Sequence, residues 1–260
     1  MGMLDGKVAI VTGIGSGMGR SIALRFAAEG ARLVLGARRE AYLKEVAAEV
    51  REIGAEVLVA PVDLASDDQC NQLVDRTLEQ FGGVDVFVQN GHDTGEFDLA
   101  MDADLARWHQ VMEVNFFGAL RISQRVVPSM IERGGGRIVL VNSGAALSSP
   151  PRHGAYAASK AALSSLARTM ANELGHSGVL VNSLTLGPVQ GENTTRAIAP
   201  QGTSDEERDR LVDEKGQALP LGHMPTPDEC AGAVLFLVSP LADAITGQSV
   251  VVNGGQWVTV

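Results

Sequence analysis

Short, continuous runs of apolar residues recur along the whole chain, and they are rich in Val and Ile. They lie at residues 7–12, 32–36, 56–62, 84–89, 137–142, 179–184 and 249–253. Continuous apolar runs of this length suit strands that are buried on both faces, as in a parallel sheet covered by helices. The pattern therefore predicts seven buried strands.

A different periodicity fills the intervals between these runs. In residues 40–54, apolar side chains recur at steps of three and four residues, while charged side chains point away from them. The apolar positions are Leu43, Val46, Val50 and Ile53. This spacing predicts a helix with one buried face, and Gly54 is suited to end it. Ser66, with Gln69 three residues later, resembles a capping box, so we expect another helix to begin there and to end before Gly82.

Strands that alternate with helices predict right-handed βαβ crossovers and an α/β fold, a parallel sheet with helices on both faces. We find no repeat, low-complexity tract or linker, so residues 1–260 are expected to form one domain. The irregular segment is 187–227, which is rich in Gly, Pro, Thr and charged residues. An insertion of this length is often a functional lid; the alternative is a surface excursion without a role.

Composition narrows the possible partners. The formal net charge is -10, which argues against nucleic acid, because a phosphate backbone attracts a basic face. Cys70 and Cys230 lie far apart in sequence, so we expect reduced thiols rather than a disulfide framework or a metal site. The N-terminus lacks a signal-peptide pattern, and no apolar run approaches the ~20 residues that span a bilayer. We therefore expect a soluble, cytoplasmic protein that binds no metal, nucleic acid or membrane.

The first predicted strand is followed by a glycine-rich loop, TGIGSGMGRS. The strict dinucleotide fingerprint G-x-G-x-x-G does not fit, but the spacing T-G-x-x-x-G-x-G does, from Thr12 to Gly19. Glycines permit a tight turn and a close approach of the backbone to a pyrophosphate, and the helix that follows offers free N–H groups. The predicted phosphate-binding residues are Gly13, Gly15, Ser16, Gly17, Met18 and Gly19. The alternative is a glycine-rich turn that binds no ligand.

Tyr156 and Lys160 are four residues apart in a long helical pattern, GAYAASKAALSSLARTMANEL, and so share one face of it. A free tyrosine has a pKa of ~10 and is a poor acid or base at neutral pH. A nearby ammonium group favours the phenolate, so we expect Lys160 to lower the pKa of Tyr156. Ser143 follows a predicted strand, where α/β sheets bind ligands. In isolation, a Tyr and a Lys at this spacing are also typical of a surface contact.

Taken together, these motifs resemble those of the short-chain dehydrogenase/reductase family. The resemblance covers nearly the whole chain: the Thr-Gly-rich loop, VDL at the third strand, VN before Phe116, the spacing from Ser143 to Tyr156, the Tyr-x-x-x-Lys motif and NGG after the last strand. It implies a Rossmann-like, doubly wound sheet of seven parallel strands. It also implies a homotetramer that assembles through the helices containing Asn115 and Tyr156.

The family's catalytic tetrad matches Asn115, Ser143, Tyr156 and Lys160. By this resemblance, Tyr156 is the general acid in carbonyl reduction, or the base in alcohol oxidation. Lys160 lowers the pKa of Tyr156 and holds the nicotinamide ribose, and Ser143 orients the substrate oxygen. Asn115 holds a water in a proton relay that reaches Lys160.

The resemblance implies further cofactor contacts. These contacts would come from Asp63, Leu64, Asn90, Gly91, Tyr156, Lys160, Gly187 and Val189.

Two motifs depart from the family pattern. His92 replaces a glycine of the family's Asn-Asn-Ala-Gly motif, and it either turns to solvent or contacts the substrate. The segment after Leu186-Gly187 has Gly191 where the family's Thr binds the cofactor's carboxamide, unless Thr194 or Thr195 takes that place.

The second predicted strand runs into Ala37, Arg38 and Arg39. An NAD-selective relative presents an Asp at the place of Ala37, where it binds the ribose hydroxyls and repels a 2′-phosphate. A guanidinium can bind a phosphate through two parallel N–H donors, so Arg38 and Arg39 favour NADP(H). The alternative is a pair of solvated arginines with NAD(H) as the cofactor. Ser16, where many NADP-using relatives carry a basic residue, supports that alternative.

The resulting hypothesis is an NAD(P)(H)-dependent oxidoreductase that interconverts a carbonyl and a secondary alcohol by hydride transfer. A catalytically weak nucleotide-sensing protein is the alternative, and its expected signature is a broken tetrad, whereas all four residues are present. A dehalogenase relative should lack the glycine loop and carry Arg in place of Lys160. The partner is expected to be a small carbonyl or alcohol, and an apolar one, since the 145–151 segment is largely apolar.

Overall fold

The computed structural model describes residues 2–199 and 202–257, which include a seven-stranded parallel sheet with the strand order β3-β2-β1-β4-β5-β6-β7. The strands are β1 (Val8–Thr12), β2 (Arg32–Ala37), β3 (Val57–Pro61), β4 (Val86–Gln89), β5 (Gly136–Ser143), β6 (Val179–Leu186) and β7 (Ser249–Val252). All seven predicted strands are confirmed, with ends that differ by one or two residues. The parallel arrangement confirms the α/β fold class.

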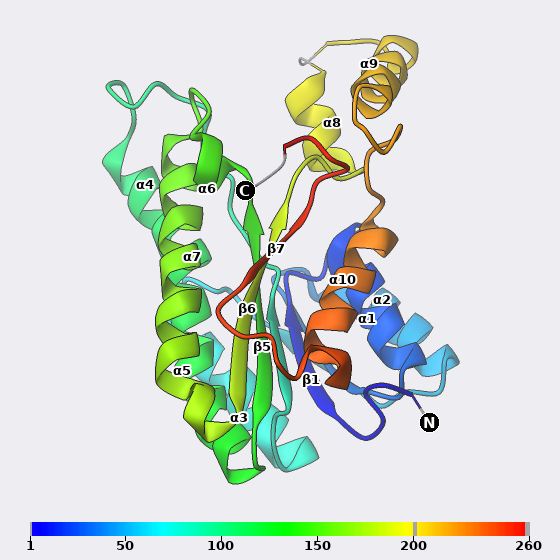
Figure 1. Cartoon of the computed structure of the whole chain (residues 1–260), viewed down its shortest axis with the longest axis vertical. Coiled ribbons are helices and arrows are strands. Elements are labelled where there is room, and N and C mark those ends of the chain that lie inside the picture. Colours follow the sequence, from blue (N-terminus) through cyan, green and yellow to red (C-terminus); the bar gives the residue numbers. More distant parts are fainter. Residues whose placement is uncertain (1, 200–201, 258–260) are drawn as a thin grey trace.

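Helices link successive strands and cover both faces of the sheet (Figure 1). One face carries α1 (Met18–Ala28), α2 (Glu40–Glu52) and α10 (Pro227–Val238), and the other carries α3 (Asp67–Phe81), α5 (Gly118–Glu132) and α7 (Gly154–Leu174). The shorter elements are α4 (Leu105–Met112), the π-helix η1 (Glu113–Phe117), α6 (Ala145–Ser148), α8 (Glu192–Ile198), α9 (Asp205–Gln217) and the 3-10 turns η2 (Gly175–Ser177) and η3 (Pro240–Ala242).

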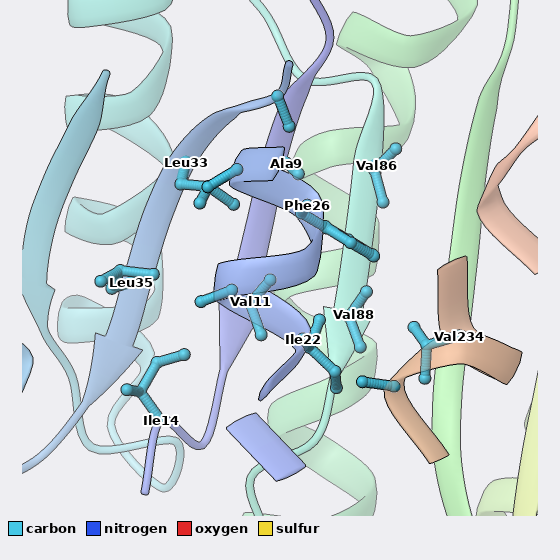
Figure 2. Close-up of a cluster of buried hydrophobic side chains, with 14 of the residues drawn as sticks. Ala9, Val11, Ile14, Ile22, Phe26, Leu33, Leu35, Val86, Val88 and Val234 are labelled. Atoms are coloured by element: carbon cyan, nitrogen blue, oxygen red, sulfur yellow. The ribbon is translucent and has the colours of Figure 1, made fainter. Parts of the chain in front are cut away.

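The strands are apolar at nearly every position because each face of the sheet meets a separate core. Figure 2 shows one core, in which Ile22 and Phe26 of α1 lie over Val86 and Val88 of β4. Phe87, between those two valines, belongs to the second core, under α3, α5 and α7. Neighbouring residues of one strand therefore point into opposite cores, as expected for a parallel sheet covered on both sides.

Two predicted helix ends are confirmed, and one capping motif is only half formed. Gly54 follows the end of α2 and Gly82 ends α3, both with positive φ (+98° and +74°), which costs glycine little. Ser66 caps α3 by accepting from the Gln69 N–H at 3.4 Å. The reciprocal bond differs from a capping box, because the Gln69 side chain accepts from the Asp63 N–H at 2.8 Å instead. This bond ties the loop after β3 to the start of α3.

The described part of the segment 187–227 contains two helices. These helices, α8 and α9, lie beyond the carboxyl ends of β5 and β6 (Figure 1). The strand order reverses between β1 and β4, and ligands of doubly wound sheets bind in the crevice at such a point, outside the carboxyl ends of the strands. The fold thus places the glycine loop, the end of β5 and the 187–227 segment at one end of the sheet.

The structure also describes the two cysteines, the length and polarity of the helices, and the groups of side chains that could bind a metal. Cys70 and Cys230 are both free and buried. Of the helices that the structure describes, none is both long enough and apolar enough to cross a bilayer. Within residues 2–199 and 202–257, we find no group of three or more His, Cys, Asp or Glu side chains placed to hold a metal ion.

Candidate active site

The loop between β1 and α1 forms a cradle whose glycines serve two different needs. A Cβ on Gly13 would lie 2.2 Å from the Gly91 nitrogen, and one on Gly19 would lie 2.4 Å from the Gly13 oxygen, so both positions require glycine for packing. Gly15 and Gly17 face space in which the described part of the chain places no atom within 4 Å of such a Cβ. In the same region, α1 starts without a side-chain cap or an acid in its first turn. These features fit a bound pyrophosphate.

A cavity of about 350 Å³ adjoins this cradle at the carboxyl ends of β1, β2 and β4. Its lining includes seven of the predicted cofactor residues, namely Gly13, Arg38, Arg39, Asp63, Leu64, Asn90 and Gly91. Asn90 Nδ2 donates to the Gly13 carbonyl at 2.8 Å and so joins the loops after β4 and β1. The remaining predicted contacts are not among the lining residues. Gly15, Ser16, Gly17, Met18 and Gly19 lie in the loop and first turn of α1, Gly187 and Val189 follow β6, and Tyr156 and Lys160 lie on α7.

The two arginines after β2 differ in their surroundings. Both are exposed and line the cavity. The Arg39 guanidinium lies over the Tyr42 ring, 5.4 Å from its centroid. Arg38 forms no ion pair with any carboxylate in the described part of the chain, and its charge contributes to a lowered pKa of Asp93. Arg38 is therefore the freer of the two guanidinium groups.

Lys160 and Tyr156 project from the same face of α7 toward the end of β5. The Lys160 Nζ donates to the Val141 carbonyl at 2.8 Å and lies 5.7 Å from the centroid of the Tyr156 ring. Only 2% of Lys160 is exposed. This burial disfavours the ammonium form and lowers the pKa of Lys160 to about 7. At neutral pH the group is thus poised to gain or lose a proton.

The electrostatics of Tyr156 differ from the expectation. Burial raises the pKa of Tyr156, and hydrogen bonding with Ser143 acts in the opposite direction without cancelling it. The prediction that Lys160 lowers this pKa is wrong for the structure described here. The physical reason is that the phenol is enclosed by protein, while Lys160 is bonded to a backbone carbonyl and its own pKa is lowered.

Asn115 lies in the middle of η1, a π-helix between α4 and α5. The sequence predicts only a helical stretch here, and the wider π turn is a feature often found at functional sites. The Asn115 side chain is fully buried. Its amide donates to Ser159 Oγ at 2.9 Å, and the Ser159 hydroxyl donates to the Tyr156 carbonyl at 2.8 Å. Asn115 is therefore joined to α7 next to Tyr156.

His92 faces the cavity, where its ring lies 6.2 Å from the ring of Tyr156. Its Nδ1 is 3.2 Å from the Asn90 carbonyl oxygen. Because a carbonyl only accepts, this bond requires the hydrogen on Nδ1 and leaves Nε2 as an acceptor. His92 is exposed as a whole residue, but desolvation and the charge of Lys160 lower the pKa of its ring to about 4, so the ring is neutral at pH 7. The departure from the family motif therefore places a neutral imidazole beside Tyr156.

The structure also shows contacts that no motif in the sequence indicates. Asp93 binds Asn115 through its backbone, and Arg107 binds the Asp93 carboxylate. At the C-terminal end, the Trp257 ring lies so close to Gly144 that a Cβ there would be 2.2 Å from it. Each contact joins residues that are distant in sequence, so spacing alone gives no sign of it.

The segment after β6, where Gly191 stands in place of the family's Thr, differs from the family motif in the structure as well. Gly191 is exposed and precedes α8, and Thr194 and Thr195 are part of that helix. The Gly187 N–H donates to the Val252 carbonyl at 2.9 Å. The backbone N–H of Gly187 is therefore used by β7, and its carbonyl is the group left for a ligand.

Comparison with known proteins agrees with this geometry. A family model described as "Enoyl-(Acyl carrier protein) reductase" matches residues 13–256. The 7alpha-hydroxysteroid dehydrogenase of Escherichia coli is 33% identical over 254 residues, covering 97% of this chain and 94% of that protein. The chain belongs to the short-chain dehydrogenase/reductase family. Dehydrogenase/reductase SDR family member 4 of Bos taurus is 35% identical, over 97% of this chain and 88% of that protein.

Solved structures of short-chain dehydrogenases/reductases also superpose on the chain. The L-sorbose reductase of Gluconobacter frateurii, complexed with NADPH and L-sorbose, has a TM-score of 0.93 at 31% identity, with both chains fully covered. A 7alpha-hydroxysteroid dehydrogenase complexed with NADH and 7-oxo glycochenodeoxycholic acid has a TM-score of 0.88 at 33% identity, over 97% of this chain and 94% of that chain. The protein is therefore an oxidoreductase of this family, with its Rossmann-like fold.

Proposed function

We propose that the protein reduces ketones to secondary alcohols with NADP(H), using Tyr156 as the general acid. The observation that carries this proposal is the convergence of two parts of the molecule. The first is the group of catalytic candidates, in which Tyr156 is hydrogen-bonded with Ser143 and its ring lies 6.2 Å from the ring of His92. The second is the cavity that His92 lines, which also includes Gly13 of the glycine loop and the exposed Arg38.

The residues present fit a dinucleotide bound at this cavity and the glycine loop. Gly15 and Gly17 leave room for a pyrophosphate at the start of α1. Asp63 and Leu64 would bracket the adenine, and Arg38 would bind a 2′-phosphate. The nicotinamide supplies the hydride when it is bound. Related structures contain NADPH, NADH and NAD+, so the preference for NADP(H) rests on Arg38 and on Ala37 in place of an acid.

The proton chemistry follows from Tyr156 and the side chains around it. In reduction, Tyr156 donates its hydroxyl proton to the carbonyl oxygen while Ser143 hydrogen-bonds to the same oxygen. Because burial raises the pKa of Tyr156, the phenol keeps its proton at neutral pH and is suited to act as an acid. Lys160, with a pKa of about 7, would return a proton to Tyr156 through the relay at Asn115. Oxidation needs the phenolate of Tyr156. Because the pKa of Tyr156 is raised, we expect oxidation to be faster at higher pH.

The surroundings of Ser143 support an apolar substrate. Leu147 of α6 is 62% exposed at this end of the sheet. The ring of Phe97 lies 4.7 Å from that of His153, and Trp257 packs on Gly144. Flat, apolar surfaces of this kind suit a cyclic or aryl ketone better than a sugar. A screen of NADPH oxidation with cyclic ketones, oxosteroids and ketoses separates these classes.

Tyr156→Phe tests the proposed mechanism. The change removes the transferable proton and keeps the ring, so kcat for ketone reduction is expected to fall by about 100-fold or more. The affinity for NADPH, measured by fluorescence titration, and the thermal midpoint should stay close to those of the wild type. Near-normal turnover in this variant would remove Tyr156 from the mechanism.

A further inference from the structure

The side-chain amide of Asn115 is held on two sides by one residue of the loop after β4. The Asp93 N–H donates to Asn115 Oδ1 at 2.7 Å, and Asn115 Nδ2 donates to the Asp93 carbonyl at 2.9 Å. The second Nδ2 hydrogen is used by Ser159 Oγ at 2.9 Å. Both amide hydrogens are thus committed, and the position of Asn115 depends on where Asp93 lies.

Asp93 is in turn fixed by a bidentate ion pair with Arg107 of α4. Arg107 Nη1 and Nη2 donate to the two carboxylate oxygens at 2.7 and 2.6 Å, and the Gly95 N–H donates to Asp93 Oδ1 at 2.8 Å. Only 26% of the Arg107 side chain and 21% of the Asp93 side chain are exposed. Burial opposes ionisation, but the hydrogen bonds from Arg107 and Gly95 outweigh it and hold the pKa of Asp93 below its usual value. Such a forked pair fixes direction as well as distance.

We propose that Arg107 is a positioning residue for Asn115 and acts through Asp93. Arg107 and Asn115 belong to one continuous helical segment, α4 followed by η1. This segment therefore binds the loop after β4 at two points. Arg107 holds the Asp93 carboxylate, and Asn115 holds the Asp93 backbone. Loss of the first contact frees the loop, and the π turn at Asn115 then loses its fixed partner.

These contacts also connect Arg107 and Asp93 to the surroundings of Tyr156. Ser159, which accepts from Asn115, donates to the Tyr156 carbonyl at 2.8 Å. His92, next to Asp93, lies beside the Tyr156 ring. A small shift of a positioned group can cost a large factor in rate even when the chemistry is untouched. The inference rests on the proposed function, in which Asn115 serves the proton relay to Lys160.

Arg133 offers a matched control. Its Nε and Nη2 donate to Asp85 at 3.1 and 3.0 Å, so it forms a pair of the same kind at the amino end of β4. Asp85 also accepts from the Val8 N–H at 2.9 Å. Arg133→Gln removes a bidentate ion pair from the same sheet, far from Asn115. Any effect of general destabilisation should appear in this variant as well.

A double-mutant cycle tests the proposal. Arg107→Gln is expected to lower kcat for NADPH-dependent ketone reduction by about 10-fold or more, with a smaller change in KM. In an Asn115→Ala background, Arg107→Gln should cause no further loss, because the group that it positions is gone. Arg133→Gln should leave kcat near the value of the parent enzyme in both backgrounds. Additive losses, or equal losses from Arg107→Gln and Arg133→Gln, would overturn the proposal.

Hydrogen exchange gives a readout that does not depend on the proposed reaction. In Arg107→Gln, the amides of residues 91–95 and 113–117 should exchange faster, and in Arg133→Gln they should not. Faster exchange together with a wild type that reduces no ketone would refute the proposed function and keep the positioning role. Unchanged exchange would refute the positioning role whatever the activity. If Arg107→Gln does not fold, Asp93→Asn, which keeps the backbone contacts and one acceptor, is tested in the same way.

Discussion

Arg38 and Arg39 are adjacent in sequence, and their side chains have different partners. The Arg39 guanidinium lies over Tyr42, whereas Arg38 is exposed at the edge of the cavity and has no ion-pair partner in the described part of the chain. A hydrogen bond to a charged group is worth about 1.5–3 kcal/mol, and a guanidinium can make two to one phosphate. A free guanidinium at this place is the feature expected of a 2′-phosphate site.

We therefore predict that the wild type prefers NADPH to NADH and that Arg38→Ala removes the preference. The ratio of kcat/KM with NADPH to that with NADH should fall by about 10-fold or more, because a charged hydrogen bond is lost only with the phosphorylated cofactor. Arg39→Ala should change the ratio less. Steady-state kinetics with both cofactors measure it. A wild-type preference for NADH, or an unchanged ratio in Arg38→Ala, would show that Arg38 does not bind the 2′-phosphate.

At this scale, the sequence predicts which residues lie close together better than it predicts the shifts of their pKa values. Motif spacing is sufficient to bring Ser143, Tyr156 and Lys160 together, because a strand end and a helix face fix their directions. The direction of the pKa shift of Tyr156 is a different matter. It depends on how much protein encloses the phenol, which is a property of packing that local sequence does not contain. The Arg107–Asp93 ion pair was not predicted either, because tertiary packing brings these two residues together.

Among the elements, strands are easier to predict from this sequence than the π-helix. Each strand is buried on both faces, so its composition alone is decisive. The π-helix η1 differs from an α-helix by a single wider turn, and the apolar pattern around Asn115 fits both. The capping residue of α3 was also predictable, but the side chain of Gln69 has a closer partner in Asp63. Local rules therefore locate elements, and tertiary contacts decide their details.

The helices α8 and α9 are the elements least anchored to the core. In α9, all of whose residues are described, only Gly216 is buried. Its charged side chains pair mainly with one another, as Arg210 does with Glu207 and Glu214. We predict that residues 190–220, of which 200–201 lie outside the described part of the chain, exchange amide hydrogens fastest in the free protein and become protected when NADPH and a ketone bind. Strong protection both with and without ligands would identify a rigid wall instead of a lid.

At the scale of the whole molecule, two opposite sides carry exposed apolar side chains. On the side of α4 and η1, Leu105 is 71% exposed and Phe117 is 40% exposed. On the side of α10 and η3, Phe236 is 36% exposed and Leu241 is 72% exposed. These sides lie on opposite faces of the sheet (Figure 1). Two self-complementary surfaces on one subunit are what a closed tetramer with dihedral symmetry requires.

We predict a homotetramer in which each of these sides contacts its own counterpart in another copy of the chain. Burial of a Glu carboxylate in an interface carries a desolvation cost, so Phe117→Glu and Phe236→Glu should each reduce the tetramer to a dimer. The double variant should be a monomer. Light scattering coupled to gel filtration measures the mass at micromolar concentration. Ile53→Glu, at an exposed apolar position at the end of α2, is the matched control and should remain tetrameric. A monomeric wild type, or dissociation in the control variant, would contradict the assembly through these two sides.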